Sequence, residues 1–284
     1  MGKVYDALQR AEEQRGRQKI SGAGLPPIDD WSPTPAAKRP KIVPAWRRWL
    51  SFTSRRARMD DPNAANKRRI AMLMPDSFVA EQYRHLRARL DSIAAQRPLR
   101  TIAMTSALPN EGKTTAAINL AVVCEMHLDR RVLLVDCDLR KPKVHRALGL
   151  RPEAGLAEVL QGEAPLEKAI VRVEGGAFEG GALEVLPVKS QPSNPSELLA
   201  SAKFKSLIEE LSRRYELVIL DTPATLALPD AKTISELTDG LVMVVRADIT
   251  PQEDVQAALD ILDRRRVLGI VLNGAQVDEH YYGY

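Results

Sequence analysis

The chain has 284 residues and a formal net charge of +4, and this length is enough for one α/β domain of about 200 residues with additional segments. The charge is uneven: residues 1–69 hold 16 Lys and Arg against 7 Asp and Glu, whereas residues 70–284 hold 25 against 30, so a domain-wide nucleic-acid-binding surface is not expected. Two cysteines in apolar segments, Cys124 and Cys137, argue against a disulfide framework or a zinc site, and no apolar run reaches the roughly 18–20 residues of a membrane helix.

The first 75 residues are predicted to form a short helix followed by a flexible basic arm. Residues 3–15 have apolar side chains at helical spacing, but so short a helix is marginal, and a frayed terminus and a docking helix remain equally good interpretations. Residues 16–69 lack sustained periodicity, which indicates a linker. Residues 38–69 contain eleven Lys and Arg against two acids, and residues 46–50 add two tryptophans, a composition suited to an anionic membrane surface. A solvated basic linker or a nucleic-acid arm would have a similar composition.

Residues 76–96 are predicted to form an amphipathic helix at the start of the folded domain. An apolar stripe at helical spacing is formed by Phe78, Tyr83, Leu86, Leu90 and Ile93. Glu81, Arg84 and Arg87 follow one another at intervals of three and share one side of this helix. They form either a contact surface or a solvated face with internal ion pairs, each worth about 0.2–0.5 kcal/mol.

From residue 99 onward the sequence predicts apolar strands that alternate with helices. The strands are expected near residues 99–105, 131–136, 183–187, 216–221, 240–246 and 267–272. The helices are expected near residues 113–128, 155–161, 195–212, 229–236 and 252–265. This alternation predicts a mostly parallel α/β sheet with helices on both faces, and such sheets bind ligands at the carboxyl ends of their strands.

A phosphate-binding loop is predicted between the first of these strands and the helix that begins at Lys113. The loop pattern is GxxxxGK[ST], and the chain fits it at every position except the first, where Ala107 replaces glycine. Gly112 lets the backbone approach a phosphate closely, Lys113 would reach the β- and γ-phosphates of ATP, and Thr114 would place its hydroxyl on Mg²⁺. An accidental Gly-Lys-Thr in an ordinary strand–turn–helix is the alternative, and two further motifs argue against it.

Three carboxylates are predicted to lie beside this loop, because two more apolar strands end in acidic residues. Asp136 and Asp138 follow one strand, and Arg140 comes two residues later. Buried unpaired charge is costly, so this pair needs a cation, and Mg²⁺ and Arg140 are the candidates. Asp221 ends another strand in a Walker B pattern and is expected to hold Mg²⁺ through water. A capping Asp would explain one of these carboxylates but not all three in this order.

The end of the chain supplies two more candidate features. Asn273 ends the last predicted strand, and its amide could read the edge of adenine, although Asn273-Gly274 as a plain turn fits equally well. Tyr281, Tyr282 and Tyr284 lie within the last four residues of a chain that has only six tyrosines. A kinase that phosphorylates a neighbouring copy of itself would require such a tail.

These motifs together resemble the bacterial tyrosine kinases that control capsule and exopolysaccharide synthesis and that use a P-loop ATPase-like fold. The resemblance covers residues 76–284. It rests on the loop from Ala107 to Lys113, the pattern of Asp136, Asp138 and Arg140, the strand-end Asp221, the pattern of Glu81, Arg84 and Arg87, and the stretch from Asn194 to Leu199. The opening from Val4 to Leu8 resembles members found with exosortase-type systems. The chain departs from the family at Asn110, where Gly is frequent, and at Ala224, where a second Pro is common.

The resemblance implies a role for each matching residue. The expected nucleotide-binding residues are Pro109, Asn110, Glu111, Gly112, Lys113, Thr114, Thr115, Arg140 and Asn273. The expected magnesium ligands are Thr114, Asp136 and Asp221, and the expected catalytic residues are Lys113, Asp136, Asp138 and Asp221, with Asp138 orienting or deprotonating the tyrosine hydroxyl. The expected ring contact is formed by Glu81, Arg84 and Arg87, and the expected phosphorylation sites are Tyr281, Tyr282 and Tyr284.

The predicted function is therefore an ATP- and Mg²⁺-dependent tyrosine autokinase of exopolysaccharide or capsule biosynthesis. Its predicted parts are residues 1–75, the kinase domain at 76–273 and the tail at 274–284. The expected partners are a membrane-embedded activator of the polysaccharide co-polymerase type, further copies of the chain in a ring, and an anionic membrane surface, without nucleic acid. The N-terminus lacks a signal-peptide core, so a cytoplasmic location at the inner face of the cell membrane is expected.

Two other functions remain open on the sequence. Partition and division-site ATPases share the fold, but they carry a second lysine five residues before the loop lysine, where this chain has Leu108. A non-catalytic, nucleotide-binding regulator of polysaccharide assembly is the other alternative, because the sequence shows binding groups more clearly than it shows turnover.

Overall fold

The computed structural model describes residues 69–127, 130–175, 178 and 181–275. These residues belong to one compact unit of the chain, Arg58–Tyr284. The predicted helix at residues 3–15, the basic arm and the three tail tyrosines lie outside the described residues, so those predictions stay untested. Among the helices that the structure describes, none has the length and apolar character needed to cross a membrane.

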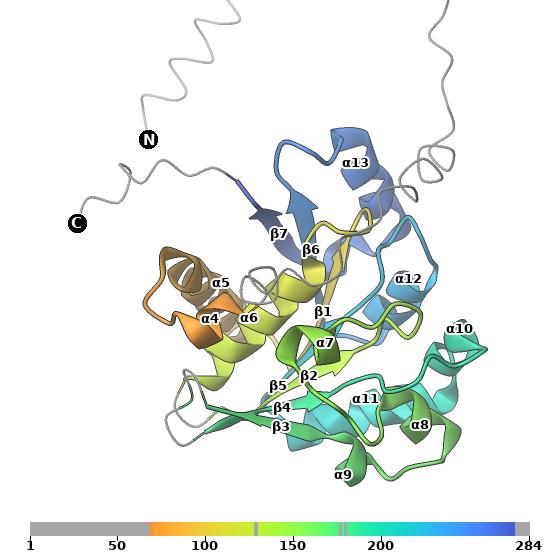
Figure 1. The fold of residues 1–284 in the computed structure, drawn as a ribbon. Coiled ribbons are helices and arrows are strands. Elements are labelled where there is room, and N and C mark those ends of the chain that lie inside the picture. The colour runs from red at the N-terminus through yellow and green to blue at the C-terminus, as the bar shows by residue number, and fades with distance from the viewer. Residues whose placement is uncertain (1–68, 128–129, 176–177, 179–180, 276–284) are drawn as a thin grey trace, which may run out of the picture. The chain divides into compact units, whose positions relative to one another are not determined.

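A seven-stranded sheet forms the centre of the described unit (Figure 1). Its strands in spatial order are β3 (Val171–Glu174), β4 (Ala182–Leu186), β2 (Val132–Asp136), β5 (Leu217–Asp221), β1 (Thr101–Ser106), β6 (Gly240–Arg246) and β7 (Val267–Asn273). Every pairing is parallel except that of β3 with β4, which is antiparallel. The predicted, mostly parallel α/β sheet is confirmed, and each of the six predicted strands is present. Strand β3 was not predicted, because four residues with a single buried side chain give little signal.

The helices follow the strands as predicted, with additional short ones. They are α4 (Ile70–Leu73), α5 (Phe78–Ala94), α6 (Lys113–Glu125), α7 (Val144–Leu148), α8 (Leu156–Gln161), α9 (Leu166–Ala169), α10 (Pro195–Leu199), α11 (Ala202–Arg214), α12 (Asp230–Glu236) and α13 (Gln252–Ile261), with a 3₁₀ turn at Arg264–Arg266. The single helix predicted at 195–212 is two helices. The Ser201 side chain accepts a hydrogen bond from the Phe204 N–H, so it caps α11 and separates it from α10.

Successive residues of the central strands face opposite layers, as a pleated strand requires. On β2, Leu134 packs with α4, α5 and α6, whereas Leu133 and Val135 pack with α8, α11 and α12. Helix α13 covers β6 beside this second layer. Helix α6 is buried along most of its length, because α4 and α5 cover its outer side (Figure 1). This burial explains why the sequence of α6 is apolar all round.

The topology brings the predicted motifs together at one edge of the sheet. Strand β1 lies between β5 and β6, and β5 lies between β1 and β2. Asp136 at the end of β2 pairs in register with Asp221 at the end of β5, and Met104 of β1 pairs with Asp221 on the other side. Ligands of such sheets bind beyond the carboxyl ends of the strands, where successive connections leave toward opposite faces. The candidate site is therefore expected between the loop after β1 and these two acids.

The folded unit extends N-terminal to the boundary that the sequence suggested at residues 75 and 76. Ala71 and Met72 of α4 are buried in the layer that contains α6. The Ala71 N–H donates to the Asn119 Oδ1 of α6 at 2.9 Å, which anchors the beginning of the described chain to the helix that carries the loop lysine. The chain that precedes the domain thus enters beside α6.

Candidate active site

The loop between β1 and α6 has the backbone shape that its sequence requires. Gly112 has φ of +96° and Asn110 has φ of +69°, both in the left-handed region. Glycine adopts this region freely, and Asn is among the few other residues that tolerate it. The Asn found here in place of the more frequent glycine therefore keeps the loop conformation. It also adds a side-chain carbonyl at the mouth of the site.

Glu111 holds the loop from within. Its side chain is buried, one carboxylate oxygen accepts the Leu108 N–H at 2.8 Å, and the other accepts the Thr250 hydroxyl. Leu108 packs against the apolar layer under α13. The predicted nucleotide-binding role of Glu111 is therefore indirect in this structure, because its carboxylate is used inside the protein.

The end of β7 is attached to the same loop. The Asn273 amide donates to the Glu111 carbonyl at 2.8 Å. A Cβ at position 112 would lie only 1.9 Å from Asn273 Nδ2, a distance that atoms cannot adopt. Glycine is thus required at position 112 by its backbone conformation and by this contact. Asn273 lies in the site, as predicted, and its amide is engaged with the loop.

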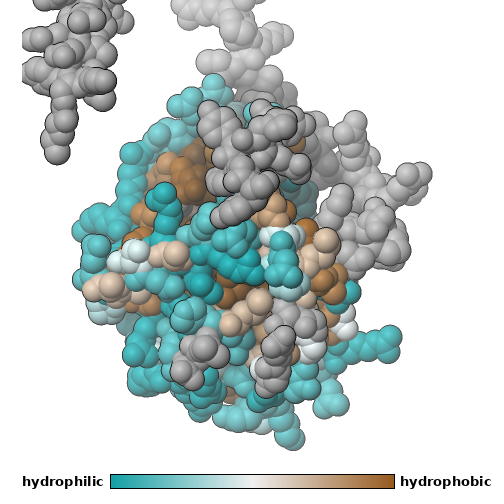
Figure 2. Space-filling model, turned by 90° about the vertical axis from the view of Figure 1, so that its left-hand side faces the viewer, coloured by the Kyte–Doolittle hydropathy of each residue, from teal (hydrophilic) through white to brown (hydrophobic). Residues whose placement is uncertain are grey.

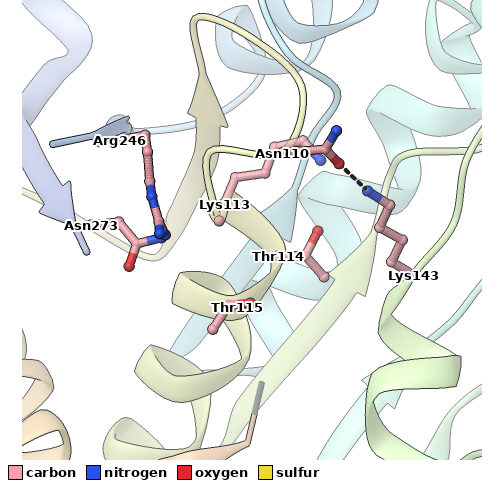
Figure 3. Close-up of a pocket in the computed structure, with 8 residues that line it drawn as sticks. Asn110, Lys113, Thr114, Thr115, Lys143, Arg246 and Asn273 are labelled. Atoms are coloured by element: carbon pink, nitrogen blue, oxygen red, sulfur yellow. Dashed lines mark hydrogen bonds between the residues drawn. The ribbon is translucent and has the colours of Figure 1, made fainter. Parts of the chain in front are cut away.

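A cavity of about 400 Å³ opens along the loop, within the size range of small-molecule sites (Figure 3). It is lined by Asn110, Gly112, Lys113, Thr114, Thr115, Lys143, Arg246 and Asn273. Six of these residues were predicted, and Lys143 and Arg246 were missed. Arg246 ends β6 and could have been found by the strand-end argument that identified Asn273. Pro109, Glu111 and Arg140 were also predicted, but they are not among the lining residues.

Asp136 is fixed by the backbone that follows it. Its Oδ2 accepts the N–H groups of Lys143 at 3.1 Å and Val144 at 3.0 Å, and its Oδ1 accepts the Asp138 N–H at 3.2 Å. The side chain is completely buried. Burial and the neighbouring charge of Asp221 raise the pKa of Asp136 to about 8, although these N–H groups oppose the rise.

Asp221 and Lys113 form the other half of this buried charge cluster. Lys113 Nζ lies 3.4 Å from Asp138 Oδ2 and 4.0 Å from Asp221 Oδ1. Burial opposes the charge of Lys113, but the charges of Asp221, Asp138 and Asp136 outweigh burial and raise the lysine pKa. Burial raises the pKa of Asp221, and the charge of Lys113 and the nearby Thr114 hydroxyl oppose this rise. The cluster brings together the three carboxylates and the lysine that the sequence identified.

The residues around Asp221 fit a magnesium ion that arrives with a nucleotide. Both Asp221 carboxylate oxygens are buried without a well-formed hydrogen bond. Uncompensated buried oxygens of this kind are costly, and a hard cation with its waters would compensate them. No group of three or more potential ligands within the described residues forms a complete cage. Thr114 and Asp221 would therefore hold Mg²⁺ together with phosphate oxygens, whereas both oxygens of Asp136 are already used by backbone groups.

Arg140 turns away from the cavity and joins the strand-end loop to two helices. Its guanidinium donates to the Ser196 hydroxyl of α10 at 2.8 Å and lies 3.4 Å from the buried Asp230 carboxylate at the start of α12. Ser196 also donates to Asp230. Asp230 was not singled out from the sequence, because an Asp at a helix start has many ordinary explanations.

The predicted contact pattern on α5 is largely satisfied within the chain. Arg84 donates to Glu81 at 2.6 Å and to the Pro75 carbonyl at 2.7 Å. Arg87 donates to the Val123 carbonyl of α6 at 3.1 Å. Glu81 is exposed, whereas Arg84 and Arg87 are half-buried. These side chains are therefore held in place before any contact with another molecule.

Comparison with known proteins assigns this arrangement to a family. Residues 99–264 match the AAA domain family, which is more than half of the chain. The tyrosine-protein kinase YwqD of Bacillus subtilis is 38% identical over 218 residues, which cover 76% of this chain and 90% of YwqD. The solved kinase domain of the Escherichia coli tyrosine kinase Etk is 28% identical, with a TM-score of 0.67 over 83% of this chain and 89% of that domain. The chain belongs to the bacterial tyrosine-protein kinase family.

Two further comparisons bear on the function. The succinoglycan biosynthesis transport protein ExoP of Rhizobium meliloti is 34% identical over 74% of this chain, but the chain spans only 27% of ExoP. The cell division ATPase MinD of Pyrococcus furiosus is 28% identical, with a lower TM-score of 0.51 over 61% of this chain and 71% of that protein. The P-loop ATPase-like fold predicted from the sequence is thus confirmed, and the kinases resemble the chain more extensively than this ATPase does.

We predict that Gly112→Ala abolishes nucleotide binding, whereas Gly149→Ala does not. Both glycines have left-handed φ angles, but a Cβ at position 149 meets nothing within 4 Å, whereas one at 112 meets Asn273. The Gly149 variant should lose about 1 kcal/mol of unfolding free energy from backbone strain. The Gly112 variant should lose more, and its affinity for a fluorescent ATP analogue should fall below detection. Equal affinity in the two variants would contradict the role of the contact with Asn273.

We also predict that the ligand-free protein in EDTA becomes less stable as the pH rises from about 4 to 8. Asp136 has its pKa raised from the ordinary value to about 8, so in this window the folded chain retains a proton that the unfolded chain has lost. One such group lowers the unfolding free energy by at most about 1.4 kcal/mol per pH unit. The slope, measured by chemical denaturation, should be shallower in Asp221→Asn, which lacks the neighbouring charge. Identical slopes in both proteins would show that the two acids do not share a proton.

Proposed function

We propose that the chain is an ATP-dependent protein tyrosine kinase that phosphorylates the C-terminal tyrosines of a neighbouring copy. The observation that supports this most is the meeting of Lys113 with Asp138 and Asp221 at the loop end of the sheet. Membership of the tyrosine kinase family, with a relative that shares almost the whole length of the folded unit, supports the same reaction.

The three carboxylates differ in access, and this difference supports a division of labour. The side chain of Asp138 is 11% exposed, whereas that of Asp221 is 1% exposed and Asp136 is fully buried. A base must reach the proton that it removes. Asp138 is therefore the carboxylate that can accept the proton of a tyrosine hydroxyl, while Asp136 fixes the backbone and Asp221 serves the metal.

The reaction is the transfer of the terminal phosphoryl group of ATP. The tyrosine oxygen forms a bond to the γ-phosphorus, the bond from that phosphorus to the β–γ bridging oxygen breaks, and ADP leaves. Lys113 and the N–H groups at the start of α6 hold the phosphates, because helix N-termini bind anions. Bound Mg²⁺ would supply additional charge neutralisation at the phosphates.

The acceptor is narrowed by the burial of the tyrosines in the described domain. Tyr83 and Tyr215 are both at least nine-tenths buried. Burial raises the pKa of Tyr83 to about 12, and it also raises the pKa of Tyr215, with a further contribution from Glu184. Neither hydroxyl can enter another molecule's site without unfolding. The acceptors that we propose are therefore the tail residues Tyr281, Tyr282 and Tyr284.

The contact between copies is proposed on the face formed by α4 and α5. Exposed apolar side chains lie there beside the charged pattern of α5, namely Leu73, Met74, Phe78 and Val79. Figure 2 shows this side of the molecule as a mainly hydrophilic surface with separate apolar areas. Apolar side chains next to charges of both signs suit a head-to-tail contact, and such contacts generate closed rings. The ring is proposed on this basis.

The partners and the location are proposed from the relatives and the arm. One relative is named a succinoglycan biosynthesis transport protein, and we propose that this chain acts in polysaccharide assembly together with a separate membrane-embedded activator. The basic arm is proposed to hold the kinase at the anionic inner membrane surface, since each nearby Lys or Arg contributes roughly 1 kcal/mol. Full-length protein should sediment with anionic vesicles at low salt and be released at high salt. Equal sedimentation with neutral vesicles would refute this role of the arm.

No specific observation favours the partition or division-site type of ATPase. Leu108 stands where those proteins carry their second lysine, and its side chain packs against the core and adds no charge to the site. The non-catalytic regulator is distinguished from the kinase by transfer itself. A phosphotyrosine blot of the purified chain with Mg-ATP separates all three functions.

We predict that label will pass between chains when two inactive variants are mixed. One variant is Lys113→Ala, and the other has Tyr281, Tyr282 and Tyr284 replaced by Phe. Lys113→Ala alone should give no phosphotyrosine, because transfer depends on charge neutralisation at the phosphates. The exposed Lys205→Ala should behave as wild type. In the mixture, the tail of the Lys113→Ala chain should become labelled at a rate that increases with protein concentration.

The same mixture tests the contact on α5. Glu81→Ala with Arg84→Ala removes charges of both signs and keeps Arg87, which donates to Val123 within the chain. Transfer should fall at least about tenfold when both variants carry this pair of changes, with the loss restored at high protein concentration. Labelling of wild type at a rate independent of dilution, with no label in the mixture, would instead mean that transfer occurs within one chain.

A further inference from the structure

Lys143 is a cation of the cavity to which the sequence patterns assign no role. It immediately precedes α7 and lies three residues after Arg140. Its Nζ donates to Asn110 Oδ1 at 3.1 Å, across the mouth of the loop. Figure 3 shows it on one side of the loop, with Arg246 and Asn273 together on the other side. The loop with Lys113 therefore lies between two cationic groups from different elements.

The backbone of Lys143 is held by the site itself. Its N–H donates to Asp136 Oδ2, and so does the N–H of the next residue, Val144. Asp136 in turn lies beside Asp221 in the register of the sheet. The position of the Lys143 Cα is thus fixed relative to the strand ends, whereas its half-exposed side chain ends on a neutral amide in a loop.

The charges of the site call for a cation beyond Lys113. Lys113 faces Asp138 and Asp221, and Asp136 adds a third carboxylate nearby. A nucleotide triphosphate brings further negative charge even with its metal. In a partly buried site such charges repel strongly unless more positive charge is present. Lys143 supplies it on the side of Asp221, whose pKa its charge lowers.

The two additional cations are placed for different parts of a nucleotide. Arg246 lies at the ends of β6 and β7, where its guanidinium carbon is 2.7 Å from a Cβ built on Gly274. It lies beside Asn273, on the side of the loop away from the acids. Lys143 lies on the side of Asp136 and Asp221, where the reacting phosphate must meet the metal and the base. The reacting end of the nucleotide is therefore the part that Lys143 can reach.

We propose that Lys143 binds the terminal phosphate of Mg-ATP and stabilises the charge on the phosphoryl group as it is transferred. This role rests on the proposed kinase function. On binding, the ammonium group exchanges the neutral Asn110 carbonyl for a phosphate oxygen, and a hydrogen bond between two charged groups is stronger than the one it replaces. Lys143 is then a catalytic residue that acts on the same phosphate as Lys113 from the opposite side.

The test compares ATP with ADP in the full-length protein. Lys143→Met should weaken Mg-ATP binding about tenfold, measured by displacement of a fluorescent nucleotide, and should leave Mg-ADP binding within about twofold of wild type. Lys143→Arg should recover most of the ATP affinity, because the charge is kept. Arg146→Met removes one exposed positive charge from the same short helix and should bind both nucleotides as wild type does. Thermal unfolding of each variant confirms that the fold is kept.

The transfer rate gives a second readout. At saturating Mg-ATP, Lys143→Met should phosphorylate the tail about 10- to 100-fold more slowly than wild type. An unchanged ratio of ATP to ADP affinity, or an equal loss for both nucleotides, would overturn the proposal even if wild type is an active kinase. A selective loss for ATP in a wild-type background that makes no phosphotyrosine would support the phosphate contact and refute the kinase function instead.

Discussion

The structure of the site depends on two buried acids at the ends of neighbouring strands. Asp136 and Asp221 face each other in register, and neither has a cation in direct contact. Burying two like charges is tolerated only with compensation, and here it comes from three backbone N–H groups, from Lys113 and from a raised pKa. This arrangement makes the ligand-free site unfavourable by itself. It gives a metal-bound polyphosphate more free energy to release on binding than a neutral cleft would.

The same constraint orders the elements around the site. The N–H groups that satisfy Asp136 belong to the segment that starts α7, so this segment cannot shift without exposing the acid. Arg140, in the middle of that segment, joins it to α10 and α12 through Ser196 and Asp230. The loop after β2 is therefore fixed at both sides, and it connects the nucleotide site with the second helical layer. A rigid support of this kind is what precise phosphoryl transfer requires.

Much of this could be predicted from the sequence, because the strong signals are local. Apolar strands that end in Asp, and a helix that begins at Gly-Lys-Thr, identified the sheet, the loop and the three carboxylates. The residues that were missed act through contacts distant in sequence. Lys143 reaches Asn110 across 33 positions, and Arg140 reaches Asp230 across 90. No local pattern distinguishes a lysine that faces a cavity from one that faces water. The helix at 195–212 was predicted as one, because a Ser inside a helical pattern shows its capping role only through its geometry.

The contact between Gly112 and Asn273 has a consequence for how such a protein can change over evolutionary time. The two positions are far apart in the chain, yet the amide fills the space that any side chain at position 112 would occupy. Asn273 can be replaced by a smaller residue while glycine stays, but glycine cannot be replaced while Asn273 stays. Substitutions at this pair therefore have a permitted order. The end of the last strand must retreat first, and a lineage that keeps the amide has no single-step route away from glycine.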